Sequence, residues 1–182
     1  MKKLIGFGDF LLWFFNLISK LYLTVIRGTP VVVQLLIIYF VIFASVDIDK
    51  VLVAVIAFGI NSAAYVAEIF RGGIMSIDQG QMEAGRSLGF NYAQTMVHFI
   101  FPQAFKAVLP ALANEFITLL KESSVAFYLG VADLTQGGLK IRSQTYSNFM
   151  PLIAVALVYL ALVLILTYLV GILERRLRKS ER

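Results

Sequence analysis

One uncharged apolar stretch, residues 150–173, limits the fold of this chain more than any other feature. A helix needs roughly 20 consecutive apolar residues to cross the hydrocarbon core of a bilayer, and this stretch is long enough. Of the 182 residues, 59% are apolar and 15% are charged. A typical soluble domain has about 25% charged residues. The chain is therefore predicted to be an all-α, polytopic integral membrane protein, with one transmembrane domain over residues 1–182.

Three further stretches are predicted to span the membrane. They are residues 30–46, residues 51–67 and the weaker stretch 107–127, which charged residues interrupt. A fifth apolar run, residues 10–26, contains Asn16, Ser19 and Lys20. We interpret it as an interfacial helix or as the stub of a span. The expected architecture is thus a helical bundle with about four spans.

Lysine and arginine are distributed unevenly around these four spans. Both termini then lie on one side of the membrane, together with residues 71–106. That side holds twelve basic residues, and the other side holds four: Lys50, Lys121, Lys140 and Arg142. Because cytoplasmic loops carry the excess of basic residues, we expect both termini and residues 71–106 to be cytoplasmic.

The cytoplasmic segment between the third and fourth stretches has the pattern of two helices joined by a turn. Ser76 is expected to cap the first helix and Asn91 the second. Gly89 stands where a left-handed residue ends a helix, and Pro102 is expected to limit or kink the second helix. The simplest alternative is that this segment only connects two spans.

Residues 83–102 read EAGRSLGFNYAQTMVHFIFP. This resembles the EAA signature of ABC importer permeases: Glu-Ala-Ala, three residues, Gly, nine residues, then Ile-x-Leu-Pro. The flanking sequences are similar to those of the polar amino acid permease subfamily, and the resemblance covers about residues 22–177. The flanking sequences that carry this similarity are RGTP at 27–30, AEIFRGGI at 67–74, NEFI at 114–117, LKESS at 120–124 and LERR at 173–176.

Three features depart from the family pattern. Gly85 replaces the second alanine of the signature, and Phe99 and Phe101 replace isoleucine and leucine before the proline. Permeases of this family usually begin with one more transmembrane helix, and this sequence starts about where that helix would end.

The resemblance implies a type I ABC importer permease fold and a function as the transmembrane subunit of an ATP-driven importer of polar amino acids. Such a subunit works by alternating access in the prokaryotic cytoplasmic membrane. Its implied partners are cytoplasmic ATPase subunits that carry ATP and Mg²⁺, a second permease subunit that is identical or paralogous, and an extracytoplasmic amino-acid-binding protein. Nucleic acid is not an expected partner.

The residues themselves give little support to an enzyme. The chain has no Gly-x-x-x-x-Gly-Lys-Ser/Thr sequence, so ATP hydrolysis is expected on a separate chain. It has no cysteine and one histidine, His98, so neither a thiol nucleophile nor a metal cluster is predicted. The alternatives are a secondary transporter or channel that needs no ATPase, and a membrane scaffold.

The EAA-like segment, within a coupling loop at about residues 72–104, is expected to dock on the ATPase. Small side chains at positions 84 and 85 would let the partner approach the backbone. Glu83 and Arg86 are three residues apart and could pair on one helical face. The expected coupling residues are Glu83, Ala84, Gly85, Arg86, Gly89 and Pro102.

Polar residues inside the predicted spans are candidates for the substrate path, because charge that faces lipid is costly. Glu115 is the strongest candidate, since a carboxylate within a span is hard to explain by packing. For Asn61 and Ser62, hydrogen bonds that hold helices together explain the pattern equally well. The full set is Glu115, Asn61, Ser62, Tyr65, Asn114 and Thr118.

Overall fold

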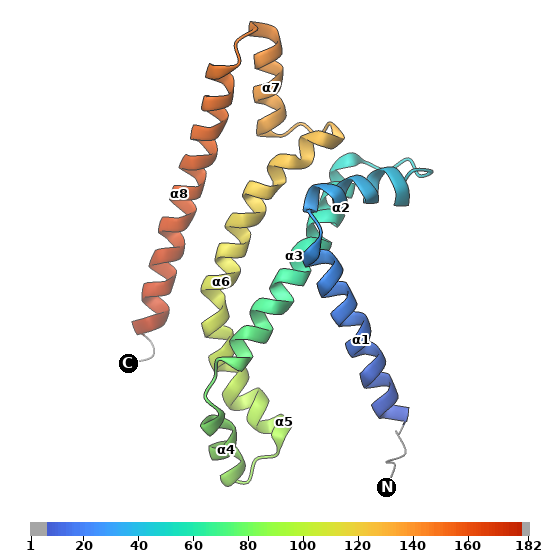
Figure 1. Cartoon of the computed structure of the whole chain (residues 1–182). Helices are drawn as coiled ribbons and strands as arrows, with labels where there is room; N and C mark the ends of the chain where they lie inside the picture. The colour runs from blue at the N-terminus through green and yellow to red at the C-terminus, as the bar shows by residue number, and fades with distance from the viewer. Residues whose placement is uncertain (1–6, 180–182) are drawn as a thin grey trace. The chain divides into compact units, whose positions relative to one another are not determined.

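The computed structural model describes residues 7–179, and its regular structure is entirely helical (Figure 1). The basic residues Lys2, Lys3 and Arg182, which entered the charge count, lie outside this range. The chain divides into two compact units, Met1–Ala64 and Tyr65–Arg182, and the division falls within one long helix, α3 (Lys50–Met75). We call them the N-terminal and C-terminal units and describe each separately.

The N-terminal unit contains α1 (Phe7–Gly28), α2 (Val31–Ile37) and the first part of α3. Pro30 takes the N-cap position of α2, where its missing N–H costs nothing. A π-helical turn, Ile38–Ile42, continues α2. The hydroxyl of Tyr22 donates to the carbonyl of Ile60 across 2.5 Å and so joins α1 to α3.

Two of the predicted spans need correction. The run 30–46 is wrong as a span, because only Val31–Ile42 is helical there. Twelve residues rise about 18 Å, which is short of a hydrocarbon core of about 30 Å. The run 10–26, interpreted as an interfacial helix or a stub, instead belongs to an apolar helix long enough to span, Gly8–Gly28. Its polar residues do not break the helix.

The described residues therefore contain four helices long and apolar enough to cross a membrane. This agrees with the predicted number, although the set has changed. They are Gly8–Gly28, Lys50–Met75, Tyr92–Leu129 and Phe149–Leu177. Many large apolar side chains on them are exposed, including Leu157, Leu160 and Leu164. That exposure suits helices whose outer surface meets lipid rather than water.

The C-terminal unit is built around one long helical rod and two helices that pack on it. Within this unit, α8 packs against α6 and α7, while α4 and α5 lie at the end of α6 away from α7 (Figure 1). The elements are α4 (Gln79–Ser87), α5 (Tyr92–Thr95), a π-helical turn (Met96–Ile100), α6 (Phe101–Glu122), a 3₁₀ helix (Ser123–Leu129), α7 (Leu134–Thr145) and α8 (Phe149–Lys179).

The rod runs without interruption from Tyr92 to Leu129. Pro102 is the second residue of α6, and one residue, Phe101, separates it from the π-helical turn Met96–Ile100. A proline removes one backbone donor, and a π-helical turn is one of the ways in which a helix accommodates such a defect. Pro102 therefore does not end the second helix of the coupling loop.

A close approach of two helices holds the end of α3 against α6. A Cβ atom added at Gly73 would overlap the side chain of Val108 and stand 3.4 Å from the carbonyl oxygen of Ala104. Val108 and Ala104 are both buried. Small residues at helix contacts in membrane proteins allow backbones to approach in this way.

Candidate functional site

The first cap of the coupling loop differs from the prediction. Asp78, not Ser76, is the N-cap of α4, and its Oδ1 accepts a hydrogen bond from the N–H of Gly80 at 2.8 Å. The hydroxyl of Ser76 instead donates to the carbonyl of Gly73 at 2.8 Å, within the end of α3. Ser76 therefore stands directly after α3 and binds its last turn, because α3 continues to Met75, further than its sequence pattern indicated.

The turn at Gly89 is confirmed. Gly89 has a φ of 88°, which is the left-handed region that favours glycine. The N–H of Phe90 donates to the carbonyl of Gly85 at 3.2 Å, and the N–H of Gly89 donates to that of Arg86 at 3.0 Å. These two bonds form a Schellman motif, which satisfies carbonyls at the end of α4 and reverses the chain.

The second cap is also confirmed. The side chain of Asn91 accepts from the N–H of Gln94 at 2.9 Å, and the side chain of Gln94 accepts from the N–H of Asn91 at 2.9 Å. This reciprocal capping box starts the rod that becomes α6. The coupling loop is therefore a short helix, a glycine turn and a capped second helix.

One face of α4 is open. Glu83, Ala84 and Arg86 are exposed there, and Leu88 is 73% exposed just beyond the helix. Within residues 7–179, no ion pair joins Glu83 to Arg86, which corrects the predicted pairing. A pair of solvated side chains three residues apart gains only a few tenths of a kcal/mol, about 0.2–0.5 kcal/mol, so its absence is unsurprising.

Gly85 does not belong to this open face. It is buried, and a Cβ atom added there would overlap the methyl group of Thr95 and stand 2.9 Å from its Oγ1. Thr95 has no exposed surface. The small residue at position 85 thus lets α4 approach the rod, and it does not let an outside partner approach α4 as predicted.

In α3, two predicted substrate-path residues are buried, Asn61 and Ser62. The Nδ2 of Asn61 donates to Oε1 of Gln34 at 3.0 Å. Gln34 in turn donates from Nε2 to the carbonyls of Ile26 and Thr29, at 2.7 and 3.0 Å. Asn61 therefore belongs to a hydrogen-bonded network within the N-terminal unit, as the helix-holding alternative expects.

Gln34 was missed by sequence reasoning. The only signal is an amide side chain inside an apolar run, and such a residue is costly to bury unless it is hydrogen-bonded. It is 8% exposed. Its position close to the start of α2 lets it bind the carbonyls that end α1.

The C-terminal half of α3 contains Tyr65 and Glu68. Tyr65 is half-buried and has an interaction partner within the chain. The guanidinium of Arg71 donates from Nε to the carboxylate of Glu68 at 2.8 Å. This ion pair between residues i and i+3 leaves the apolar stretch of α3 with its charges neutralised at one end.

The other predicted substrate-path residues lie on α6. Asn114 is exposed, and Glu115 and Thr118 are half-buried. The hydroxyl of Thr118 donates to the carbonyl of Asn114 at 3.1 Å, so it is used within its own helix. Glu115 has an interaction within the chain, and its carboxylate is close enough to that of Glu122 to interact electrostatically.

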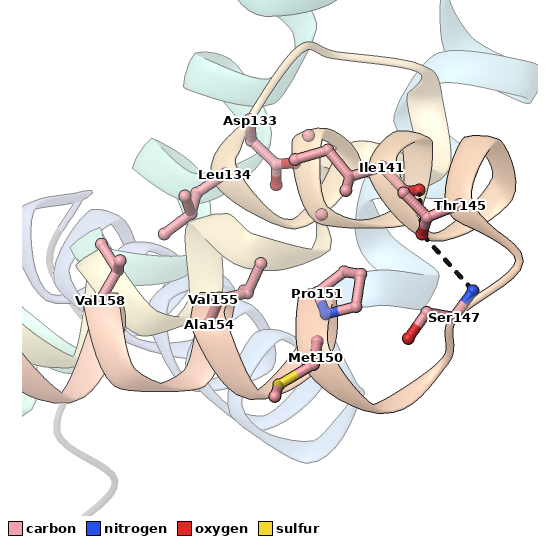
Figure 2. A pocket seen from close by; sticks show the side chains of 12 residues that line it. Asp133, Leu134, Ile141, Thr145, Ser147, Met150, Pro151, Ala154, Val155 and Val158 are labelled. Carbon is pink, nitrogen blue, oxygen red and sulfur yellow. Dashed lines mark hydrogen bonds between the residues drawn. The ribbon is translucent and has the colours of Figure 1, made fainter.

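A second feature that the sequence did not indicate is a groove of about 640 Å³ between α7 and α8 (Figure 2). Leu134, Ile141 and Val155 line it, with Asp133 at one end. The Oδ1 of Asp133 caps α7 by accepting from the N–H of Gln136 at 2.6 Å, and its Oδ2 is buried without a hydrogen-bond partner among the described residues. The other polar side chains of the lining are Thr145 and Ser147, and most of the remaining lining residues are apolar, so the groove has few of the converging polar groups that a polar amino acid needs.

The sequence matches a known transport family over residues 8–179, described as binding-protein-dependent transport system inner membrane component. It is 43% identical to the arginine transport system permease protein ArtQ of Bacillus subtilis, over 90% of this chain and 76% of that protein. It is 39% identical to the glutamine transport system permease protein GlnP of Escherichia coli, over 91% of this chain and 77% of that protein.

Solved structures agree with the sequence matches. A crystal structure of an amino acid ABC transporter with histidines superposes with a TM-score of 0.83 at 47% identity, over 88% of this chain and 75% of that one. The MetNI methionine ABC transporter superposes with a TM-score of 0.74 at 19% identity, over 96% of this chain and 80% of that one, and it shows the fold alone. The chain therefore belongs to the binding-protein-dependent transport system inner membrane component family, as a permease subunit of an ABC importer with the type I fold and with ATP hydrolysis carried by separate chains.

Proposed function

We propose that this permease carries a polar amino acid into the cell by alternating access, driven by ATPase subunits that dock on α4. The observation that carries this proposal is the geometry of α4. It is a short helix capped at both ends, and its face at Glu83, Ala84 and Arg86 is open. The relatives named for arginine and glutamine transport support a polar amino acid as the substrate.

The corrected spans also support an orientation of the chain in the membrane. If α1, α3, the rod and α8 are the spans, both termini and α4 would lie on the same side. Lys20, near the middle of α1, is left out, and every other basic residue within a span is assigned to the nearer end of that span. Arg27 then moves to the opposite side, yet the basic residues still favour the side of α4. Ten lie there (Lys2, Lys3, Arg71, Arg86, Lys106, Arg175, Arg176, Arg178, Lys179, Arg182), against five opposite (Arg27, Lys50, Lys121, Lys140, Arg142). This asymmetry supports cytoplasmic termini and a cytoplasmic α4.

Glu115 remains the proposed contact for the positively charged part of the substrate. It lies in the middle of an apolar helix and is half-buried, beside the exposed amide of Asn114. A carboxylate at this depth is expensive unless a cation, water or a proton accompanies it. Tyr65 and Ser62 are secondary candidates, while the bond from Asn61 to Gln34 supports a structural role for Asn61.

The proposal implies further subunits. A single permease with four spans would pair with an identical or paralogous permease to enclose a path, and an extracytoplasmic binding protein would deliver the substrate. The name of the matched family supports the last of these. A secondary transporter, the competing proposal, would need neither the ATPase nor the open face of α4.

Two measurements test the proposal. The permease should co-purify with an ATPase subunit, and vesicles that hold the complex should take up amino acid only when ATP is supplied on the ATPase side. Uptake that follows an ion gradient without ATP would favour the secondary transporter.

A labelling experiment tests the orientation. The chain has no native cysteine, so a Ser87→Cys variant should resist a membrane-impermeant thiol reagent in intact cells and react after lysis. Labelling in intact cells would place α4 outside.

A further inference from the structure

At Gly85, α4 packs directly against the rod, and the contact has no room for a larger side chain. A Cβ atom at Gly85 would stand 2.9 Å from Oγ1 of Thr95 and 3.2 Å from its Cβ, and would overlap its methyl group. Gly85 and Thr95 are both buried. Interiors packed at this density do not absorb an added methyl group unless a neighbour moves.

Thr95 cannot easily be that neighbour. Its N–H donates to the carbonyl of Asn91 at 2.9 Å, and its hydroxyl donates to the same carbonyl at 3.0 Å. A β-branched side chain in a helix is already restricted at χ1, and this bond restricts it further. Thr95 therefore presents a rigid surface to Gly85.

Two further contacts join α4 to the rod, one on each side of Gly85. Near the start of α4, Oε1 of Gln81 accepts from Nε2 of Gln103 at 3.4 Å. After its end, the ring of Phe90 meets that of Phe99 edge to face, with centroids 5.2 Å apart. The helix is thus held to the rod at both ends and in the middle.

A cavity of about 400 Å³ lies where the end of α3, α4 and the π-helical turn Met96–Ile100 meet. Ile74 lines it from α3, Met82 from α4 and Met96 from the turn. The packing there is less complete than at Gly85, because a cavity leaves its lining atoms without contacts. The attachment of α4 to the rod therefore depends on the contacts at Gly85, Gln81 and Phe90 and not on the residues that line this cavity.

We propose that Gly85 and Thr95 form a lock that makes α4 and the rod one rigid body. A displacement of α4 is then carried along the rod to Asn114, Glu115 and Thr118. Thr95 acts as a positioning residue, and it touches neither the ATPase nor the substrate. The proposal rests on the proposed function only for the identity of the subunit that displaces α4.

The first test adds one methyl group at the contact. Gly85→Ala should lower the amount of substrate carried per ATP hydrolysed by about tenfold, the scale of an overpacked contact, while the ATPase still co-purifies. Adding Thr95→Ala removes the overlapping methyl and hydroxyl groups and should restore coupling. Gly137→Ala, in α7 where an added Cβ meets no atom within 4 Å, is the matched control and should transport normally.

Three results would overturn the lock. Normal coupling in Gly85→Ala would show that the contact is loose. Failure of Thr95→Ala to restore coupling would show that Thr95 is not the partner. Loss of ATPase co-purification in Gly85→Ala would place Gly85 on the docking face after all. If the unmodified permease itself does not bind an ATPase, the proposed function fails instead, and the two failures are distinguishable.

The second test does not depend on a strained variant. Met82→Cys and Met96→Cys place one thiol on each side of the same cavity. If α4 and the rod move as one body, a short bifunctional thiol reagent that joins them should leave ATP-driven transport unchanged. Each single variant treated with the same reagent controls for simple modification. Transport that stops only in the cross-linked double variant would show that α4 moves relative to the rod.

Discussion

The side-chain amide of Asn61 donates to Oε1 of Gln34 across 3.0 Å, and both residues are buried in the N-terminal unit. Gln34 also binds the backbone where α1 ends, at Ile26 and Thr29. One amide side chain thus joins α1, α2 and α3. Removing one partner of a buried hydrogen bond costs more free energy than the bond itself contributes, because the remaining group stays buried and unpaired.

Asn61→Leu should therefore destabilise the protein by about 1–3 kcal/mol, the cost of leaving Oε1 of Gln34 without a donor. Thermal unfolding in detergent measures it. Asn114→Leu, at an exposed position on α6, should leave the unfolding temperature unchanged. If Asn61→Leu unfolds normally but no longer transports, Asn61 contacts substrate and its structural interpretation is wrong.

Glu115→Gln keeps the shape of the side chain and removes its charge. We expect weaker uptake, with a larger loss for a basic amino acid than for a neutral one, and basal ATP hydrolysis that persists. Glu122→Gln, two turns further along α6, should have a smaller effect, because Glu122 lies outside the proposed path and acts on it only through its electrostatic interaction with Glu115. Unchanged rate and affinity for every substrate in Glu115→Gln would assign Glu115 a structural role.

Gly89→Leu places a side chain at a φ of 88°. The left-handed region costs most residues roughly 1–2 kcal/mol, so the Schellman turn should weaken and the ATPase should bind less well. Gly89→Asn should lose less, because asparagine tolerates this region better than leucine. Uptake and ATPase co-purification are measured together, with membrane abundance as the control. Equal behaviour of the two variants would show that the turn is not sensitive to this backbone conformation.

Glu83→Lys reverses the charge on the open face of α4. Since Glu83 makes no ion pair with Arg86, we expect no change in unfolding temperature and a clear loss of ATPase co-purification and transport. Glu83→Gln keeps the size of the side chain and removes its charge. Its ATPase co-purification and transport should lie between those of the unmodified permease and those of Glu83→Lys. Normal co-purification of Glu83→Lys would remove Glu83 from the docking face.

Asp133→Ala removes the N-cap of α7, which costs about 0.5–2 kcal/mol in comparable helices. Faster hydrogen exchange at the first amides of α7, Gln136 in particular, is the expected readout, because Gln136 donates to Oδ1 of Asp133. Asp133→Asn keeps a capping oxygen and should retain most of the protection. Unchanged exchange in Asp133→Ala would mean that the packing of α7 on α8 alone holds the helix.

Much of the coupling loop could be predicted because its signals are local. A glycine needs no distant residue to favour a left-handed turn, and Asn91 with Gln94 closes its capping box within four positions. Ser76 was misassigned for a related reason. Ser76 and Asp78 are both good caps, and the choice depended on how far the preceding helix continued along its packed surface.

The span assignment shows the limit of hydropathy. Residues 30–46 and 10–26 are both apolar enough to be considered, but only the second forms a long helix. Gln34 distinguishes the two runs, because its side chain binds the carbonyls of Ile26 and Thr29 and so holds α2 at the end of α1. Apolar content alone contains no information about that contact.

The sequence by itself determined that this chain is a helical membrane protein and that it carries an EAA-like segment of two helices joined by a glycine turn, because burial of apolar length and capping of helix ends are properties of short segments. The tertiary structure decided the roles of single residues. Whether Gly85 serves a partner or the interior depends on Thr95, ten positions away, and whether Asn61 binds substrate or Gln34 depends on a residue in another helix. Those roles depend on which helix faces pack together, because a residue on one helix is buried only when a second helix covers it.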